Sequence, residues 1–133
     1  MSTSHIQMLL GPDPKAPGVA RRVLRGELEG VVAPELLERA TLLLSELVTN
    51  SVRHAGLRPE ERIEVIVTAS AAGLRVEVTE PGEGFEVMEV REPKPDVLAG
   101  GWGLYLVDRL SSAWGVVGGE ETRVWFEVND TGR

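Results

Sequence analysis

Apolar residues recur at helical spacing through one long stretch of the chain, from Pro34 to Gly56. At about 100° per residue they fill one broad arc of a helix. The arc holds Leu36, Leu37, Ala40, Leu43, Leu44, Leu47, Val48, Ser51, Val52 and Ala55. A proline in the first turn and a glycine after the last turn are typical of helix ends. The pattern therefore predicts a long helix with one buried face.

Three polar residues gather beside the edge of this arc: Glu46, Asn50 and Arg53. Glu46 and Asn50 are four residues apart, so both side chains can address one ligand or metal ion. Their oxygen atoms suit Mg²⁺, which takes few protein ligands together with substrate phosphates. A solvated helix face with a local polar contact is the plainer alternative, and the helix judged alone favours it.

The other segments alternate between helical and strand patterns. In chain order, they predict a strand at 5–10, a helix at 16–28, a strand hairpin at 63–69 and 74–78, a third helix at 104–110, and a closing hairpin at 114–118 and 122–128. Helices and strands in this order predict an α+β fold. We expect a two-layer sandwich, with helices on one face of a mostly antiparallel mixed sheet, in a single domain over residues 1–133.

Strand parity places two polar residues on the inward side of the sheet. Glu80 follows Val76 and Val78, and Thr122 precedes Val124, in each case two residues along the strand. Because a buried carboxylate is costly without a partner, an inward Glu80 points to a ligand. An acidic turn at a strand end is the plainer alternative.

Glycines follow Glu80 and precede the third helix. Gly82 and Gly84 would let the backbone approach a flat ligand closely. The run from Gly100 to Gly103 would expose amide groups at a helix N-terminus, where anions bind. Structural loop glycines would explain either pattern taken alone.

Composition narrows the function classes. The formal net charge of -7 argues against nucleic-acid binding as the main function, because phosphate backbones are held by clustered Lys and Arg. The chain has no cysteine and two histidines, which excludes thiolate chemistry and a multi-histidine metal site. No apolar run approaches the roughly 20 residues of a membrane helix, so we expect a cytoplasmic protein without membrane contact.

Together, three of these segments resemble the N box, G1 box and G2 box of the GHKL ATPase superfamily. They are residues 46–55, residues 80–85 and residues 101–104. Within that superfamily the chain resembles the small anti-sigma factor serine/threonine kinases of bacteria, whose final strand is similar to residues 122–127. The resemblance runs from about Pro14 to Val128.

The resemblance implies a Bergerat-type pocket that binds ATP and Mg²⁺. Glu46 would be the general base, Asn50 would hold Mg²⁺, and residues 85–100 would form a lid. The remaining implied ligand-binding residues are Arg53 in the N box, Glu80, Gly82, Gly84 and Thr122 near adenine, and Gly101, Gly103 and Leu104 at the phosphates.

One residue departs from the family pattern. The family has an Asp that accepts a hydrogen bond from the adenine amino group, and this chain has Glu80, followed by Pro81. Glu is one methylene longer, so it can make the same bond only if the backbone sits slightly farther back. Loss of the bond would cost about 1–3 kcal/mol, or roughly tenfold to hundredfold in affinity.

Two functions follow as expectations. The first is a protein kinase that phosphorylates an antagonist protein and also sequesters a sigma factor. The second is a non-catalytic interaction module with weak or no ATP binding. A histidine kinase catalytic domain is a poorer interpretation, because the chain lacks room for a phosphoacceptor helix pair. A homodimer is expected only from the resemblance.

Overall fold

The structure is a computed structural model that describes residues 3–82 and 100–129. Eight elements follow one another along the chain: β1 (Ser4–Leu10), α1 (Ala16–Leu28), α2 (Pro34–His54), β2 (Ile63–Ser70), β3 (Gly73–Pro81), α3 (Gly100–Leu110), β4 (Ala113–Val117) and β5 (Glu121–Asn129).

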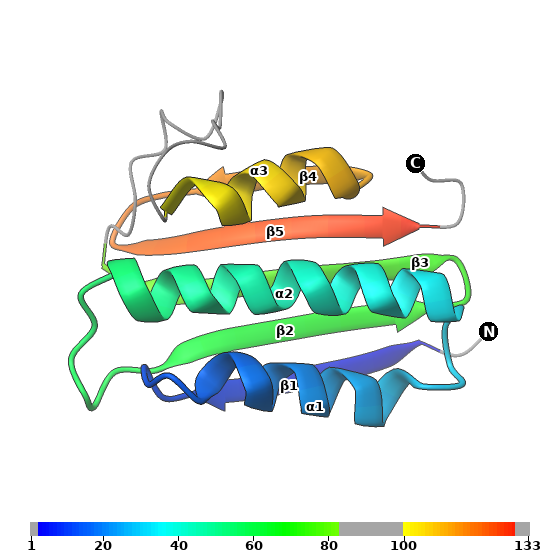
Figure 1. Ribbon diagram of the computed structural model, residues 1–133, viewed down its shortest axis with the longest axis horizontal. Coiled ribbons are helices and arrows are strands. Elements are labelled where there is room, and N and C mark those ends of the chain that lie inside the picture. Colours follow the sequence, from blue (N-terminus) through cyan, green and yellow to red (C-terminus); the bar gives the residue numbers. More distant parts are fainter. Residues whose placement is uncertain (1–2, 83–99, 130–133) are drawn as a thin grey trace.

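The five strands form one sheet in the order β1-β2-β3-β5-β4, and every pair of neighbours is antiparallel. Figure 1 shows the three helices side by side on one face of this sheet. The helix α2 lies in the middle, and it contacts α1, α3, β3 and β5. The predicted α+β sandwich is confirmed.

The strands form where apolar and polar residues alternate. In β2 and β3 every second residue is buried, and Val67 pairs with Val76 across the hairpin. A slip of one residue would turn the apolar side of a strand to solvent, so this alternation fixes the register. The same parity buries Glu80 and Thr122, as the sequence predicts.

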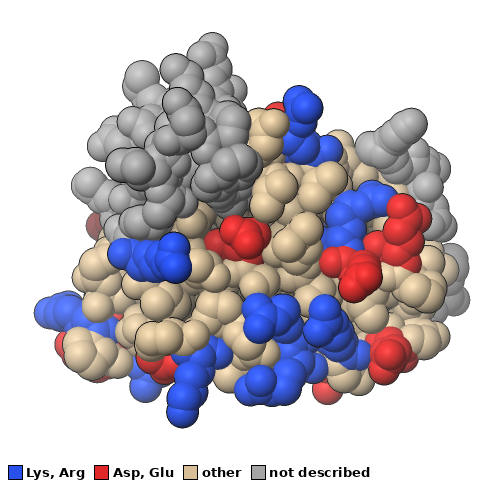
Figure 2. Space-filling model, viewed as in Figure 1, with Lys and Arg blue, Asp and Glu red and all other residues tan. Residues whose placement is uncertain are grey.

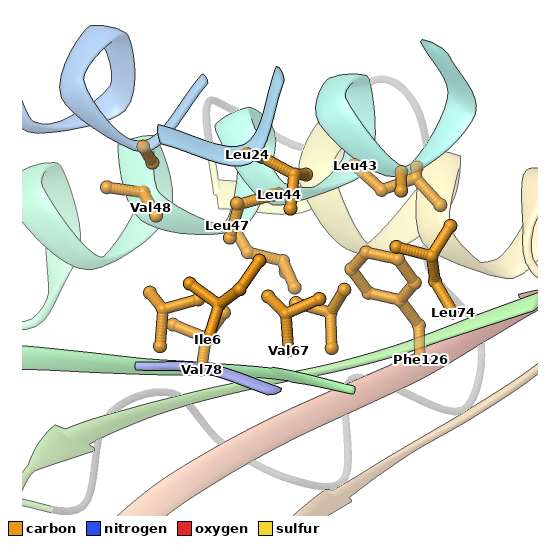
Figure 3. Close-up of a cluster of buried hydrophobic side chains, with 14 of the residues drawn as sticks. Ile6, Leu24, Leu43, Leu44, Leu47, Val48, Val67, Leu74, Val78 and Phe126 are labelled. Atoms are coloured by element: carbon orange, nitrogen blue, oxygen red, sulfur yellow. The ribbon is translucent and has the colours of Figure 1, made fainter. Parts of the chain in front are cut away.

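The core fills the space between the helices and the sheet. Figure 3 shows Leu43, Leu44 and Leu47 of α2 pointing toward the side chains that rise from the strands, Phe126 among them. Leu43, Leu44 and Phe126 are fully buried. Burial of such a side chain contributes about 1.5–3 kcal/mol, so α2 is held in one rotation on the sheet.

The opposite face of the sheet carries charged and aromatic side chains. The Arg75 guanidinium lies 4.4 Å from the centroid of the Trp125 ring and donates to Glu127 at 2.8 Å. The Trp125 ring in turn covers Gly115, where an added Cβ would lie 2.8 Å from the indole nitrogen. Among the described residues, the helices all lie on the other face of the sheet (Figure 1).

The helical face is richer in basic residues than the net charge suggests. Figure 2 shows Lys and Arg side chains gathered over the lower part of the view, where α1 lies. Arg22 and Arg25 of α1 are exposed, and the side chain of Arg21 donates to Ser45 Oγ of α2 at 2.7 Å.

The third helix begins earlier than the sequence pattern suggests. It starts at Gly100, so the glycine-rich run forms its first turn instead of preceding it. The apolar periodicity begins only at Leu104, which is why the pattern misplaces the start. Among the described residues, no helix combines the length and the apolar character needed to cross a membrane.

Two glycines give a matched test of this packing. A Cβ at Gly73 would lie 2.4 Å from the Val128 carbonyl oxygen, whereas at Gly26, inside α1, it would meet nothing within 4 Å. We expect Gly73→Ala to lower the free energy of unfolding by about 1–3 kcal/mol through backbone displacement. Gly26→Ala should raise it by about 0.5–1 kcal/mol, because alanine favours a helix interior. Urea denaturation measures both, and equal changes would contradict the packing described.

Candidate functional site

Four element ends gather at one end of the molecule. They are the C-terminal end of α2, the end of β3, the beginning of β5 and the first turn of α3, all at the left of Figure 1. The antiparallel pairing of the strands brings the end of β3 beside the start of β5, because Glu80 pairs with Thr122. The contacts of α2 with α3 and β3 bring the helix ends to the same place.

Glu80 is the most unusual residue at this end. Its side chain is only 4 % exposed, and the hydroxyl of Ser51 on α2 donates a hydrogen bond to its Oε1. Burial raises the pKa of the Glu80 carboxyl, and the hydrogen bond from Ser51 lowers it in part. None of the ion pairs between described residues involves Glu80. Among the described residues, the hydrogen bond to its carboxyl therefore comes from a neutral donor.

Thr122 and Gly82 fix the backbone beside Glu80. The Thr122 hydroxyl is buried and donates to the Gly82 carbonyl oxygen at 3.1 Å. The Gly82 amide donates to the Glu120 carbonyl oxygen at 2.9 Å, and Gly82 has a φ of 85°. Glycine adopts this left-handed conformation without steric cost. The chain thus turns sharply away just after Glu80, and the turn is anchored to β5.

The polar edge of α2 lies next to Ser51 in the chain. Asn50 is 8 % exposed, and its Nδ2 has no hydrogen-bond partner among the described residues. Glu46, one helical turn earlier, is half-buried, and Arg53 is exposed. A buried amide nitrogen without a hydrogen-bond partner lowers the stability of the native state. The Nδ2 of Asn50 is thus free to donate to a bound group.

These residues fit an Mg²⁺ ion of the kind that nucleotides carry. The described residues contain no group of three or more His, Asp or Glu side chains that could hold a metal by themselves. Mg²⁺ with a nucleotide needs only one or two protein oxygens, because phosphates and waters supply the rest. The side-chain oxygen of the buried Asn50 could be such a ligand, with its amide orientation set by the bound group.

The first turn of α3 supplies backbone donors. Gly101 and Gly103 lie among the first four residues of the helix, whose amides have no partner inside it, whereas Leu104 is the fifth residue and its amide lies beyond these unpaired donors. Leu104 is buried and anchors this turn to the core. Gly84 and most of the expected lid at 85–100 lie outside the described residues.

The structure thus brings Glu80, Gly82 and Thr122 into one hydrogen-bonded group, with Ser51 joining it from α2. Sequence reasoning missed Ser51 and counted it with the apolar arc. A signal existed, because Ser51 is a hydroxyl on the face of α2 that the pattern already turned toward the sheet. Its partner could not be read from the sequence, because Ser51 and Glu80 are 29 residues apart.

Comparisons with solved structures show the same fold. A crystal structure of the RsbU and RsbW domains of Rv1364c from Mycobacterium tuberculosis matches 95% of this chain at 20% identity, with a TM-score of 0.71. The Acinetobacter baumannii histidine kinase AdeS matches 93% of it at 14% identity, with a TM-score of 0.53. The chain spans 32% of the first of those proteins and 67% of the second.

A comparison with curated protein sequences found no match. The sequence model of one family, described as the histidine kinase-like ATPase domain, matches residues 11–128. That range includes every described residue of the site. By this match and by its fold, the chain belongs to the histidine kinase-like ATPase domain family.

Proposed function

We propose that the chain binds Mg-ATP and acts as a protein serine/threonine kinase that regulates a sigma factor. The observation that carries ATP binding is the buried Glu80 carboxyl, which has a raised pKa and no ion pair among the described residues. Perturbed and uncompensated groups of this kind are typical of ligand sites. The adenine amino group is a donor that would satisfy this carboxylate.

The other site residues would contact the base, the phosphates and the Mg²⁺ ion. Gly82 would let the backbone approach the base, and Thr122, which already bonds to Gly82, would hold that edge of the pocket. The amides of the first turn of α3 would bind phosphate. When bound, Mg²⁺ held by Asn50 would neutralise charge that develops on the phosphates during transfer.

Glu46 would act as the general base. It would accept the proton of a Ser or Thr hydroxyl of the partner as that oxygen attacks the γ-phosphorus of ATP. The bond between the γ-phosphorus and the bridging oxygen breaks, and ADP leaves with the electron pair. A half-buried carboxylate on the helix that also carries Asn50 is suited to this role.

The partners are proposed from the sequence motifs. The motifs resemble anti-sigma factor serine/threonine kinases, and one of the matched structures contains an RsbW domain. An antagonist protein would be the phosphoacceptor, and a sigma factor would be the sequestered protein. A homodimer and a cytoplasmic location belong to the same proposal.

A second function is favoured by one observation. The Glu80 carboxylate already accepts a hydrogen bond from Ser51, where the family has a shorter Asp. If that contact held the carboxylate out of reach of a bound base, the chain would be a non-catalytic interaction module. Nucleotide binding separates the two functions.

Binding of Mg-ATP should depend on Asn50. We expect Asn50→Ala to weaken Mg-ATP binding roughly tenfold to hundredfold, because a hydrogen bond or ligand to a charged group is worth about 1.5–3 kcal/mol. Isothermal titration calorimetry measures this. ATP with EDTA is the control, and there the wild type and the variant should bind alike. A wild-type protein that binds no Mg-ATP would favour the non-catalytic module.

Phosphoryl transfer should depend on Glu46. We expect Glu46→Ala to reduce the rate by about 10²–10⁴-fold, because general-base catalysis contributes that much. Transfer from γ-labelled ATP to candidate antagonist proteins measures it, with calorimetry to show that ATP still binds. Glu38→Ala, an exposed position on the same helix, is the matched control. An undiminished rate in Glu46→Ala would remove Glu46 as the base.

The buried carboxylate should also cost stability. Because the pKa of Glu80 is raised in the folded state, the native protein binds more protons than the unfolded chain between the ordinary and the raised pKa. Its free energy of unfolding therefore falls as the pH rises through that window. We expect Glu80→Gln to be as stable as the wild type at acid pH and more stable at neutral pH. Urea denaturation across pH tests this, and a constant difference would contradict it.

A further inference from the structure

A buried hydrogen bond between Ser51 and Glu80 joins α2 to the end of β3. Ser51 is 5 % exposed and lies on the apolar face of α2, where its neighbours Leu47 and Val48 are buried. Its hydroxyl reaches the end of β3 and donates to Glu80 Oε1. Ser51 thus occupies a core position, and its hydroxyl donates a hydrogen bond to the Glu80 carboxylate.

The backbone of Glu80 has little freedom, so its side chain decides where the carboxylate points. Glu80 pairs with Thr122 in the sheet, and the next turn is anchored through Gly82 to Thr122 and Glu120. A glutamate has one more rotatable bond than an aspartate, and each free rotor must be ordered when a ligand binds. A hydrogen bond that exists before binding removes that freedom in advance.

The contact leaves capacity for a second donor. An ionised carboxylate has two oxygens with about four acceptor positions, and a single hydroxyl fills one of them. The remaining positions accept hydrogen bonds and donate none. When it is ionised, a Glu80 carboxylate fixed in this way suits a base that presents an amino group and repels a base that presents a carbonyl oxygen at the same place.

We propose that Ser51 is a positioning residue that makes the nucleotide site selective for a 6-amino purine, by holding Glu80 as an oriented hydrogen-bond acceptor. This inference rests on the proposed ATP binding and goes beyond it. It also gives the longer side chain at position 80 a physical reason, since Glu80 extends to a donor on α2.

A selectivity measurement separates positioning from a structural role. The probes are ATP and the triphosphate of purine riboside, which lacks the 6-amino group. We expect the wild type to prefer ATP, and Ser51→Ala to reduce that preference by roughly tenfold, the effect of one hydrogen bond to a charged group. The variant should lose affinity for ATP and keep its affinity for the analogue.

Two matched variants complete the test. Ser51→Thr keeps the hydroxyl and should retain most of the preference. Ser45→Ala removes another hydroxyl of α2, one that accepts from Arg21, and should leave the preference unchanged. Thermal unfolding of each variant shows that the fold is kept.

The pH dependence of ATP binding gives an independent measurement. Affinity should fall as the pH drops through the pKa of Glu80, because only the ionised form accepts at all its positions. Since the Ser51 hydrogen bond lowers that pKa against the effect of burial, Ser51→Ala should move the midpoint to higher pH. Among the described residues, the ionisable side chains nearest along the chain to Ser51, Glu80 and Thr122 are Glu46 and Arg53 on α2, and Glu77, Glu121 and Arg123 on the opposite face of the sheet.

The outcomes are distinct. Loss of preference in Ser51→Ala with recovery in Ser51→Thr supports the inference. Equal weakening of both nucleotides, or no change of either, overturns it while ATP binding stands. A wild type that binds neither nucleotide overturns the proposed function and this inference with it.

Discussion

The packing of the apolar face of α2 on the sheet is the contact on which the rest of the structure depends. Leu43, Leu44 and Leu47 fix the rotation of the helix against the strands (Figure 3). Because the rotation is fixed, the residues at the other end of the same helix have fixed places as well. Ser51 is turned into the protein, while Glu46 and Asn50 stand at the edge of the buried face. The core of the fold thus sets the geometry of the candidate site.

The site holds groups that a purely structural protein would avoid. A carboxylate is buried against a neutral hydroxyl, and an amide nitrogen is buried without a partner among the described residues. Each lowers the stability of the native state, and each lies on an element that the core holds rigidly. Perturbed groups of this kind are more frequent at functional sites than elsewhere in proteins.

Most of the fold followed from short-range patterns. Periodic apolar residues were sufficient to predict the helices α1 and α2 and the strands β2, β3 and β5, because each pattern indicates that one face of the element is buried. The start of α3 was misplaced, since its first turn consists of glycines and Trp102 without an apolar period. Sheet order was open at the sequence level, because pairing of β3 with β5 joins segments separated by α3 and β4.

The sequence by itself determined which residues face inward, including Glu80 and Thr122, because strand parity and helical phase are local properties of the backbone. It also determined the motifs by which the chain resembles its family. Only the tertiary structure decided what those inward residues meet. The bond from Ser51 to Glu80 depends on how α2 is docked along and across the sheet, and that docking is set by the summed packing of many side chains.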